Sequence, residues 1–352
     1  MEAERPLSGA RNHLIMTQTN IAVAAGSHSN ISAKLLPLIL TAALIILFLA
    51  PHLLNPGLLF IVGMTLIQSI FALSWNLLFG FTGLASFGHA GFYAIGAYFT
   101  AAALRYDFNL PFLAVLAIAG ILGAMIALAI GVVALKRLTG IFLAVLTVAL
   151  TEALAKIIGF IPALGEQDGL GNFARPVMNF GLFTLDLTHS NDYYRFLVIA
   201  SLLIIGALWW VVHSPLGRSF RAIREDADRA RFVGIDVARY RVISFMISGG
   251  TAALAGALSA PWTRIVTLDQ VNWLASTQPI LNSLLGGFTS FWGPIVGAIS
   301  FSTINYWTRS FPGLSEIMVG GILVVVILVA PTGILGLTEK LYQRVVGKRG
   351  RA

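Results

Sequence analysis

The segment 214–241 reads SPLGRSFRAIREDADRARFVGIDVARYR and is the only long charged stretch in an otherwise apolar sequence. It contains seven of the 23 Lys and Arg residues of the chain. In a membrane protein, short loops rich in Lys and Arg stay on the cytoplasmic side. We therefore expect this segment to be cytoplasmic and to set the orientation of every apolar run around it.

The first part of this segment has the pattern of a short amphipathic helix ending at Gly234. Ser214 suits an N-cap, Pro215 suits the first helical position, and Gly234 suits a C-terminal cap. The residues of the apolar stripe are Leu216, Phe220, Ile223, Ala227 and Ala230. The opposite face carries Arg218, Arg221, Arg224, Glu225, Asp228 and Arg229, with Arg221/Glu225 and Arg224/Asp228 spaced as i,i+4 ion pairs. Such a helix lies on the membrane surface or docks into the groove of a partner protein.

The composition excludes a soluble domain. Hydrophobic residues make up 57% of the 352 residues and charged residues 11%, and the mean hydropathy is +0.84. The sequence therefore predicts an all-α, polytopic transmembrane helical bundle that contacts the lipid bilayer. The net charge of +8 follows from basic cytoplasmic loops and does not indicate nucleic acid. Because the chain has no cysteine, disulfides, thiolate metal sites and cysteine nucleophiles are excluded.

Hydropathy predicts about ten spans, some of them broken helices. Their ranges are 35–54, 58–78, 84–104, 110–135, 141–161, 196–212, 242–261, 273–287, 291–307 and 317–337. With a cytoplasmic loop 214–241, alternation places 17 Lys and Arg residues inside and five outside, with Lys156 within a span. Both termini are then cytoplasmic. The run 273–287 is short and contains Gln278, Pro279 and Asn282, so we interpret it as a broken span.

The spans define three regions of the chain. Residues 1–34 are predicted to form a disordered cytoplasmic tail, residues 35–338 the transmembrane domain, and residues 339–352 a basic cytoplasmic tail. The longest external loop, 164–194, is either a connector or a docking surface for an external partner.

The chain has no sequence motif for enzymatic chemistry. There is no phosphate-cradling Gly-rich loop with Lys, no nucleophile elbow, and no His pair with metal-ligand spacing. We therefore expect this chain to bind no cofactor, no metal and no ATP by itself.

The run 80–98, GFTGLASFGHAGFYAIGAY, is the most distinctive apolar stretch. Its small residues indicate either tight helix packing or a broken helix whose backbone lines a substrate cavity. His89 is correspondingly either a packing histidine or a substrate contact. The candidate pathway residues are Gly83, Ser86, Gly88, His89, Gly91 and Gly96. The tripeptide Gly-Phe-Thr recurs at 80–82 and 287–289, which we interpret as coincidence.

Glu152 and Lys156 stand at i,i+4 within a predicted span. Charges inside a membrane are costly and are usually paired, so we predict a buried ion pair. The alternative is a proton relay.

Several runs together resemble the branched-chain amino acid class of ABC transporter permeases. They are LSWNLLFGFTGLASFGHAGFYAIGAY, the charged segment 214–241, LAGAL, LLGGFTSFWGPIVGAI and APTGILGL, in matching order over residues 58–337. Two positions depart from the family pattern: residues 165–170 read GEQDGL, and Thr332 stands where a basic residue is usual. Relatives also carry urea, short amides and other amino acids.

The resemblance implies a multi-pass subunit of a prokaryotic plasma (inner) membrane that has no ATPase activity of its own. Its partners would be a second homologous permease subunit, two cytoplasmic ATPase subunits that bind ATP and Mg²⁺, and an extracytoplasmic substrate-binding protein. The charged helix would then couple the ATPases to transport. Phe220, Ile223 and Ala227 would seat in the ATPase groove, and Arg218, Arg221 and Arg224 would set the register. The coupling residues implied are Leu216, Gly217, Arg218, Phe220, Arg221, Ile223, Arg224, Glu225, Asp226 and Gly234.

Two other classes of function remain open from the residues. One is an ion-coupled secondary transporter that uses Glu152 and Lys156. The other is a membrane scaffold with no transport activity.

Overall fold

A computed structural model describes residues 44–135, 140–179 and 184–308, together with single positions and the short stretch 333–337 further on. The predicted tails 1–34 and 339–352, and most of the last predicted span 317–337, lie outside the described residues. The chain divides between Asn55 and Pro56 into two compact units. The described part of the first unit is a short apolar helix, Leu44–Leu53.

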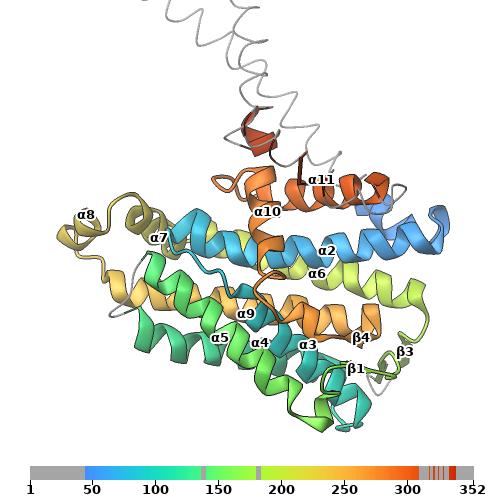
Figure 1. Cartoon of the computed structure of the whole chain (residues 1–352). Coiled ribbons are helices and arrows are strands. Elements are labelled where there is room, and N and C mark those ends of the chain that lie inside the picture. Colours follow the sequence, from blue (N-terminus) through green and yellow to red (C-terminus); the bar gives the residue numbers. More distant parts are fainter. Residues whose placement is uncertain are drawn as a thin grey trace, which may run out of the picture. The chain divides into compact units, whose positions relative to one another are not determined.

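The second unit is a helical bundle with a few two- and three-residue strands (Figure 1). Its helices are α2 (Pro56–Asn76), the π-helix η1 (Leu77–Thr82), α3 (His89–Arg105), α4 (Phe112–Ala134), α5 (Ile141–Gly159), the 3-10 turn η2 (Pro162–Leu164), α6 (Ser190–His213), α7 (Pro215–Glu225), α8 (Ala227–Phe232), α9 (Val237–Thr263), the 3-10 turn η3 (Leu268–Gln270), α10 (Thr277–Gly286) and α11 (Gly293–Thr308). Its strands are β1 (Leu170–Gly171), β2 (Val177–Asn179), β3 (Thr184–Asp186) and β4 (Ile265–Val266). β1 pairs antiparallel with β4, and β2 pairs antiparallel with β3.

Five helical segments of the described chain are long and apolar enough to cross a membrane. They are Pro56–Thr82, Phe112–Ala134, Ile141–Gly159, Ser190–His213 and Val237–Thr263. Each matches a predicted span within a few residues at most ends. The predicted spans 84–104, 273–287 and 291–307 overlap the shorter helices α3, α10 and α11.

All three of these shorter helices lie beside breaks in the helical backbone. The first break covers 83–88, between η1 and α3, and the second covers 287–292, between α10 and α11. For the first region the sequence left a broken helix and tight packing as alternatives. The break predicted within 273–287 from Gln278, Pro279 and Asn282 is misplaced, because these residues lie in the continuous helix α10 and the break follows it. Each break leaves backbone groups that neighbouring side chains or backbone must satisfy, because the bilayer core offers no water.

α9 is the central helix of the bundle and packs against α2, α3 and α4. Its crossing with α3 brings two backbones into contact. A Cβ added at Gly96 would lie 1.9 Å from the Ala253 carbonyl oxygen, and one added at Gly256 would lie 1.8 Å from the Tyr93 carbonyl oxygen. Small residues on both helices are therefore required for this approach.

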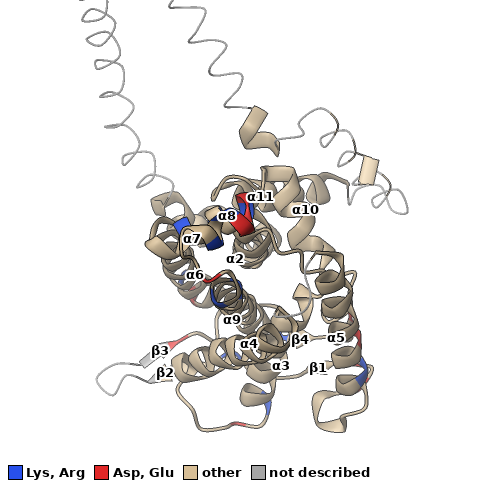
Figure 2. Cartoon of the chain, turned by 90° about the vertical axis from the view of Figure 1, so that its left-hand side faces the viewer, with Lys and Arg blue, Asp and Glu red and all other residues tan. Residues whose placement is uncertain are grey.

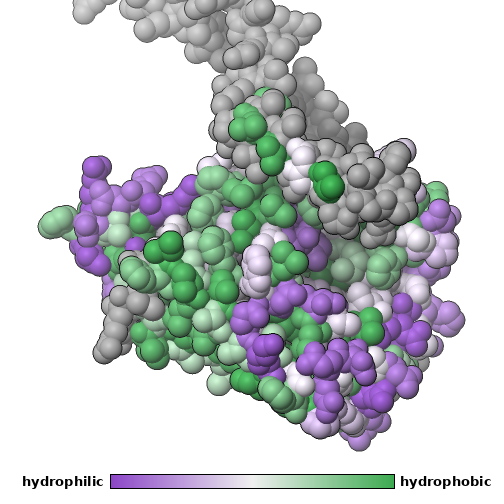
Figure 3. Space-filling model, in the orientation of Figure 1, coloured by the Kyte–Doolittle hydropathy of each residue, from purple (hydrophilic) through white to green (hydrophobic). Residues whose placement is uncertain are grey.

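Polar elements occupy opposite ends of the second unit. α7 and α8 lie at one end, and β1, β3 and β4 lie at the other (Figure 1). Figure 3 shows hydrophobic residues over the middle of the visible face, with hydrophilic residues gathered toward both ends. This banding is typical of a chain whose middle faces lipid.

Candidate functional site

The charged segment forms two helices, α7 and α8, joined at Asp226, and its last residues begin α9. The prediction of one continuous helix to Gly234 is therefore wrong. Asp226 has an extended backbone, and its carboxylate oxygen Oδ1 accepts the N–H groups of Asp228 and Arg229 at 3.0 Å each. An aspartate that caps a new helix in this way ends the preceding one. Gly234 follows α8 with a φ of 87°, as predicted for a helix end.

Ser214 and Pro215 open α7 at the predicted positions. The Ser214 hydroxyl does not cap the helix, however, because it donates to the carbonyl of Val211 at 2.6 Å. The start of α7 therefore depends on the fixed φ of Pro215 rather than on a side-chain cap.

The apolar face of α7 is buried in the bundle of this same chain. Phe220 is 0% exposed and Ile223 is 3% exposed. Phe220 belongs to a core cluster with Leu77, Phe81, Leu208, Val212 and Phe291, against which Leu216 also packs. The prediction that Phe220 and Ile223 seat in an ATPase groove is corrected, because a side chain packed in its own core is not free to dock.

Arg224 points from α7 into the bundle. Its Nη1 donates to the carbonyl of Gly80, and its guanidinium lies 5.4 Å from the centre of the Phe288 ring. The predicted surface pair of Arg224 with Asp228 is wrong, since Asp228 pairs with Arg231 at 2.9 Å. We call the contact of Arg224 with Gly80 and Phe288 the Arg224 node.

The Arg224 node joins both helix breaks. The Phe79 and Phe288 rings lie 5.3 Å apart, and Asn76 Nδ2 donates to the Ser290 carbonyl at 3.3 Å. The two Gly-Phe-Thr runs, 80–82 and 287–289, therefore lie side by side, and their similarity has a structural consequence that the sequence did not indicate. Arg224 connects α7 to both runs through side-chain contacts.

The outer side of α7 and α8 is exposed and carries mixed charge (Figure 2). Arg218, Arg221 and Glu225 are exposed, as is the pair Phe232 and Val233 at the end of α8. Phe232 is 91% exposed and Val233 is 76% exposed. The sequence interpretation missed this pair, although two apolar residues between Arg231 and Gly234 are a usable signal for a contact surface.

The carboxylate of Asp226, which caps α8, is a titratable group next to this surface. The hydrogen bond from the Arg229 backbone N–H, with a further one from Asp228, holds the pKa of the Asp226 carboxyl below its usual range. When folding lowers the pKa of a carboxyl, the charged carboxylate stabilises the folded protein at any pH above the pKa of the unfolded chain. This stabilisation is lost as the pH falls through the pKa of the folded protein. The cap is therefore fully charged at neutral pH.

His89 is fully buried at the start of α3. Its Nε2 lies 2.9 Å from the Ser74 hydroxyl and 3.4 Å from the Ser248 hydroxyl, and its ring stacks on Phe71. This geometry fits a histidine that ties α3 to α2 and α9. Its contact with substrate stays a prediction.

Side chains satisfy the backbone of the first break. The Thr147 hydroxyl accepts from the N–H groups of Phe87 and Gly88, and the Thr151 hydroxyl donates to the Gly88 carbonyl at 2.7 Å. The Trp75 indole donates to the Ser86 carbonyl at 2.7 Å. α5 and α2 thus supply partners that the broken helix requires.

The predicted pathway residues do not share one cavity. Gly88 and Gly91 line a mainly apolar cavity of about 250 Å³ between α3, α4 and α5. Gly96 packs against α9, Ser86 is buried, and Gly83 lies beside Arg224, 3.4 Å from its Cγ if a Cβ is added. The structure therefore distributes these six residues over several environments.

Comparison with known proteins identifies the family of the chain. Residues 57–330 match the family described as branched-chain amino acid transport system, permease component. The chain belongs to this family. It is a permease component of a transport system and not an enzyme.

Individual relatives agree with the family match. The high-affinity branched-chain amino acid transport system permease protein LivM of Escherichia coli (strain K12) is 30% identical over 323 residues, covering 86% of this chain and 75% of the relative. LivH of Salmonella typhimurium is 25% identical over 291 residues, covering 77% and 92%. BraD of Pseudomonas aeruginosa is 24% identical over 286 residues, covering 77% and 92%. No solved structure matches the chain.

The buried ion pair predicted for this permease is absent from the described residues. Glu152 and Lys156 form no contact within ion-pair distance, and Lys156 is exposed. Glu152 Oε1 instead accepts the backbone N–H of Trp273 at 2.9 Å. The i,i+4 spacing is compatible with an ion pair. In the fold, however, the segment before α10 lies close to Glu152 and supplies the Trp273 N–H as a hydrogen-bond donor.

The loop 164–194 of the permease is held to the bundle by arginines. Arg105 Nη1 donates to the carbonyls of Gly171 and Asn172, at 2.9 and 3.0 Å. Arg175 donates to the Pro261 carbonyl at 3.0 Å and lies over the Trp262 ring. The described part of this loop is thus ordered against the ends of α3 and α9, while its role as a docking surface stays a prediction.

Proposed function

We propose that this permease is the membrane-spanning subunit of an ATP-driven importer for branched-chain or closely related amino acids in the inner membrane of a prokaryote. The named activity of its relatives supports the substrate class. The sequence has no phosphate-binding loop, so ATP and Mg²⁺ belong to separate ATPase subunits. A second homologous permease and an extracytoplasmic binding protein complete the importer.

The observation that carries this proposal is that α7 and α8 have one side packed against the bundle and one side exposed. The inner side is fixed to the bundle by Phe220 and Arg224, while the outer side exposes Phe232, Val233 and charged residues. A rigid helix that is packed against the bundle on one face and free on the other can transmit the movement of a bound partner to the bundle. ATPase closure would move α7, and the Arg224 node would move both helix breaks with it.

The outer surface is the docking surface in this proposal. Phe232 and Val233 supply apolar anchors, and Arg218 and Arg221 set register and orientation by their charge. Asp226 holds α8 in the orientation that presents the two anchors.

The proposal is tested by Phe232→Asp and Val233→Asp in the assembled importer. We expect Phe232→Asp to weaken ATPase association by about 2 kcal/mol or more, because an exposed aromatic anchor is replaced by a charge. Co-purification of the ATPases measures the loss, and leucine uptake in proteoliposomes should fall with it. Phe160→Asp is the matched control, since Phe160 is also exposed, at 82%, but follows α5 at the other end of the bundle.

Undiminished association and uptake with both substitutions would contradict the docking role.

The class of transporter is checked in the same vesicles. Uptake that persists after collapse of proton and sodium gradients and stops without ATP excludes a secondary transporter, and uptake itself excludes a scaffold. If urea and short amides compete for uptake and leucine and valine do not, the substrate of this permease belongs to the related class of urea and short amides.

A further inference from the structure

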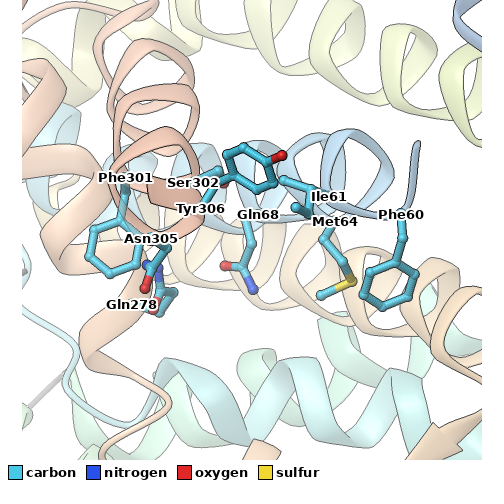
Figure 4. A pocket seen from close by; sticks show the side chains of 9 residues that line it. All are labelled: Phe60, Ile61, Met64, Gln68, Gln278, Phe301, Ser302, Asn305 and Tyr306. Atoms are coloured by element: carbon cyan, nitrogen blue, oxygen red, sulfur yellow. The ribbon is translucent and has the colours of Figure 1, made fainter. Parts of the chain in front are cut away.

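A cavity of about 280 Å³ lies between α2, α10 and α11, away from the glycine run (Figure 4). Its polar lining comes from Gln68 on α2, Gln278 on α10, and Ser302, Asn305 and Tyr306 on α11. Figure 4 shows the Gln68 amide between Asn305 and Gln278 on one side and Met64 and Phe60 on the other. Five polar side chains from three helices therefore converge on one cavity in an apolar bundle.

One amide of this cavity has unused hydrogen-bonding capacity. Gln68 Oε1 is buried and has no partner among the described residues. Behind the lining, Asn282 is fully buried, and its Oδ1 lies 3.5 Å from Gln278 Nε2. A buried amide oxygen without a partner is costly, so a donor on a molecule that enters the cavity would stabilise Gln68.

The other walls of the cavity are apolar. They are formed by Phe60, Ile61 and Met64 of α2 and by Phe301 of α11. The described lining contains no Asp, Glu, Lys, Arg or His. A lining without formal charge disfavours a ligand with net charge, because nothing compensates the loss of its hydration. A neutral or zwitterionic ligand with an aliphatic part fits these walls.

The cavity extends along α2 from one end of the bundle toward its middle. At 1.5 Å per residue, Gln68 lies about 18 Å from Pro56 along the helix axis. Phe60, at the mouth end, accepts a hydrogen bond on its carbonyl from the Trp262 indole, and Trp262 lies close to β4 in the chain. The cavity is therefore on the side of the bundle that carries the strands, opposite to α7.

The inner end of the cavity meets the start of α10. Gln278 lies in the first turn of α10 and lines the cavity with its side chain, while its backbone N–H donates to the Ala275 carbonyl at 3.3 Å. α10 and α11 continue to the second break, where the Arg224 node contacts Phe288. A movement of α7 would thus reach the two helices that form two walls of the cavity.

We propose that this cavity binds the zwitterion of a branched-chain amino acid during transport. The Gln68 amide receives the ammonium group, Gln278 and Asn305 with the hydroxyls of Ser302 and Tyr306 receive the carboxylate, and the apolar wall takes the aliphatic side chain. This assignment rests on the proposed function and names the site within the permease where the substrate binds.

The absence of cysteine from the sequence allows a direct test. Met64→Cys and Phe301→Cys each introduce a single thiol into the apolar wall of the cavity and leave its polar side chains in place, and Thr303→Cys is the control on the exposed side of α11. Assembled importers in proteoliposomes are treated from the outside with a small methanethiosulfonate reagent. The modification rate is compared with and without leucine-loaded binding protein and ATP.

We expect both cavity thiols to react and leucine turnover to slow their modification at least threefold, with no change for the control. Modification rates of the cavity thiols that are the same with and without leucine overturn the proposal. Thiols that react in the isolated chain but not in the assembled importer also overturn it, because the cavity is then an interface with the second permease. Asn305→Leu gives a second readout: we expect loss of leucine uptake with ATPase stimulation by loaded binding protein retained, and unchanged uptake refutes the site.

Wild-type uptake separates this proposal from the proposed function. A wild-type importer that does not take up leucine contradicts the proposed function itself. A wild-type importer that takes up leucine, with cavity variants that show neither protection nor loss of uptake, contradicts the cavity alone.

Discussion

At the scale of single residues, Arg224 differs most from its sequence interpretation. Its neighbour at i,i+4 is Asp228, which predicts an exposed ion pair, yet the guanidinium turns inward to the Gly80 carbonyl and the Phe288 ring. A charged hydrogen bond to a partly buried carbonyl contributes more than an exposed i,i+4 pair, so the inward contact prevails. Asp228 then pairs with Arg231.

Arg224→Gln should separate coupling from docking. The substitution removes the charge-assisted hydrogen bond and the ring contact, which costs about 1.5–3 kcal/mol of stability. We expect leucine uptake to fall while ATPase co-purification stays within twofold of wild type. Thermal unfolding in detergent and uptake in vesicles measure the two effects.

Arg239→Gln is the matched control for this experiment. Arg239 lies at the start of α9, outside the docking surface, and is exposed, so its loss should leave the unfolding temperature unchanged. Equal effects of the two substitutions on uptake and on stability would show that the Arg224 node transmits nothing.

At the scale of elements, the crossing of α3 and α9 sets how closely the bundle packs. Gly96 faces the Ala253 carbonyl so closely that no side chain fits between the two backbones. In a membrane, such contacts stabilise helix pairs because lipid provides no hydrophobic force between them. The same glycine was predicted as a pathway residue, and the structure gives it a packing role.

Gly96→Ala should push α3 away from α9 and destabilise the bundle by about 1–3 kcal/mol or more, the usual cost of overpacking. Gly206→Ala on α6 is the control, because a Cβ there meets nothing within 4 Å. It should be neutral or stabilise by about 0.5–1 kcal/mol, since alanine favours the helix. Thermal unfolding of the purified permease distinguishes these outcomes, and equal melting temperatures would refute the packing role.

At the scale of the whole molecule, the two polar ends of the second unit define an orientation. The charged helices α7 and α8 lie at one end and the strands at the other (Figure 1). Because most Lys and Arg residues of the loops are predicted to lie inside, we expect the α7 end to face the cytoplasm and the strand end to face outward.

Single-cysteine labelling tests this orientation in the permease. Asp168→Cys and Glu225→Cys place exposed thiols at the strand end and at the end of α7. We expect a membrane-impermeant maleimide to label Asp168→Cys in right-side-out vesicles and Glu225→Cys only after permeabilisation. The reverse pattern would invert the topology, and the unmodified chain serves as the unlabelled control because it has no cysteine.

Local properties explain what the sequence predicted correctly. Hydropathy over windows of span length located the five long helices. Gln278, Pro279 and Asn282 did not mark a break, because α10 runs continuously through them and the break follows at 287–292. Ser214, Pro215 and Gly234 marked helix ends, because these residues act through their own backbone geometry. The family resemblance, carried by several runs in order, was confirmed by the family match.

The sequence alone therefore determined that this protein is a helical membrane permease with one charged loop between long apolar helices. Only the tertiary structure decided that Phe220 faces inward, that Arg224 joins the two helix breaks, that Glu152 binds a backbone N–H instead of Lys156, and that Gln68, Gln278 and Asn305 share a cavity. Spacing along one helix shows which residues share a face. Which neighbour covers that face depends on contacts between residues far apart in the chain, and these form only when the helices pack.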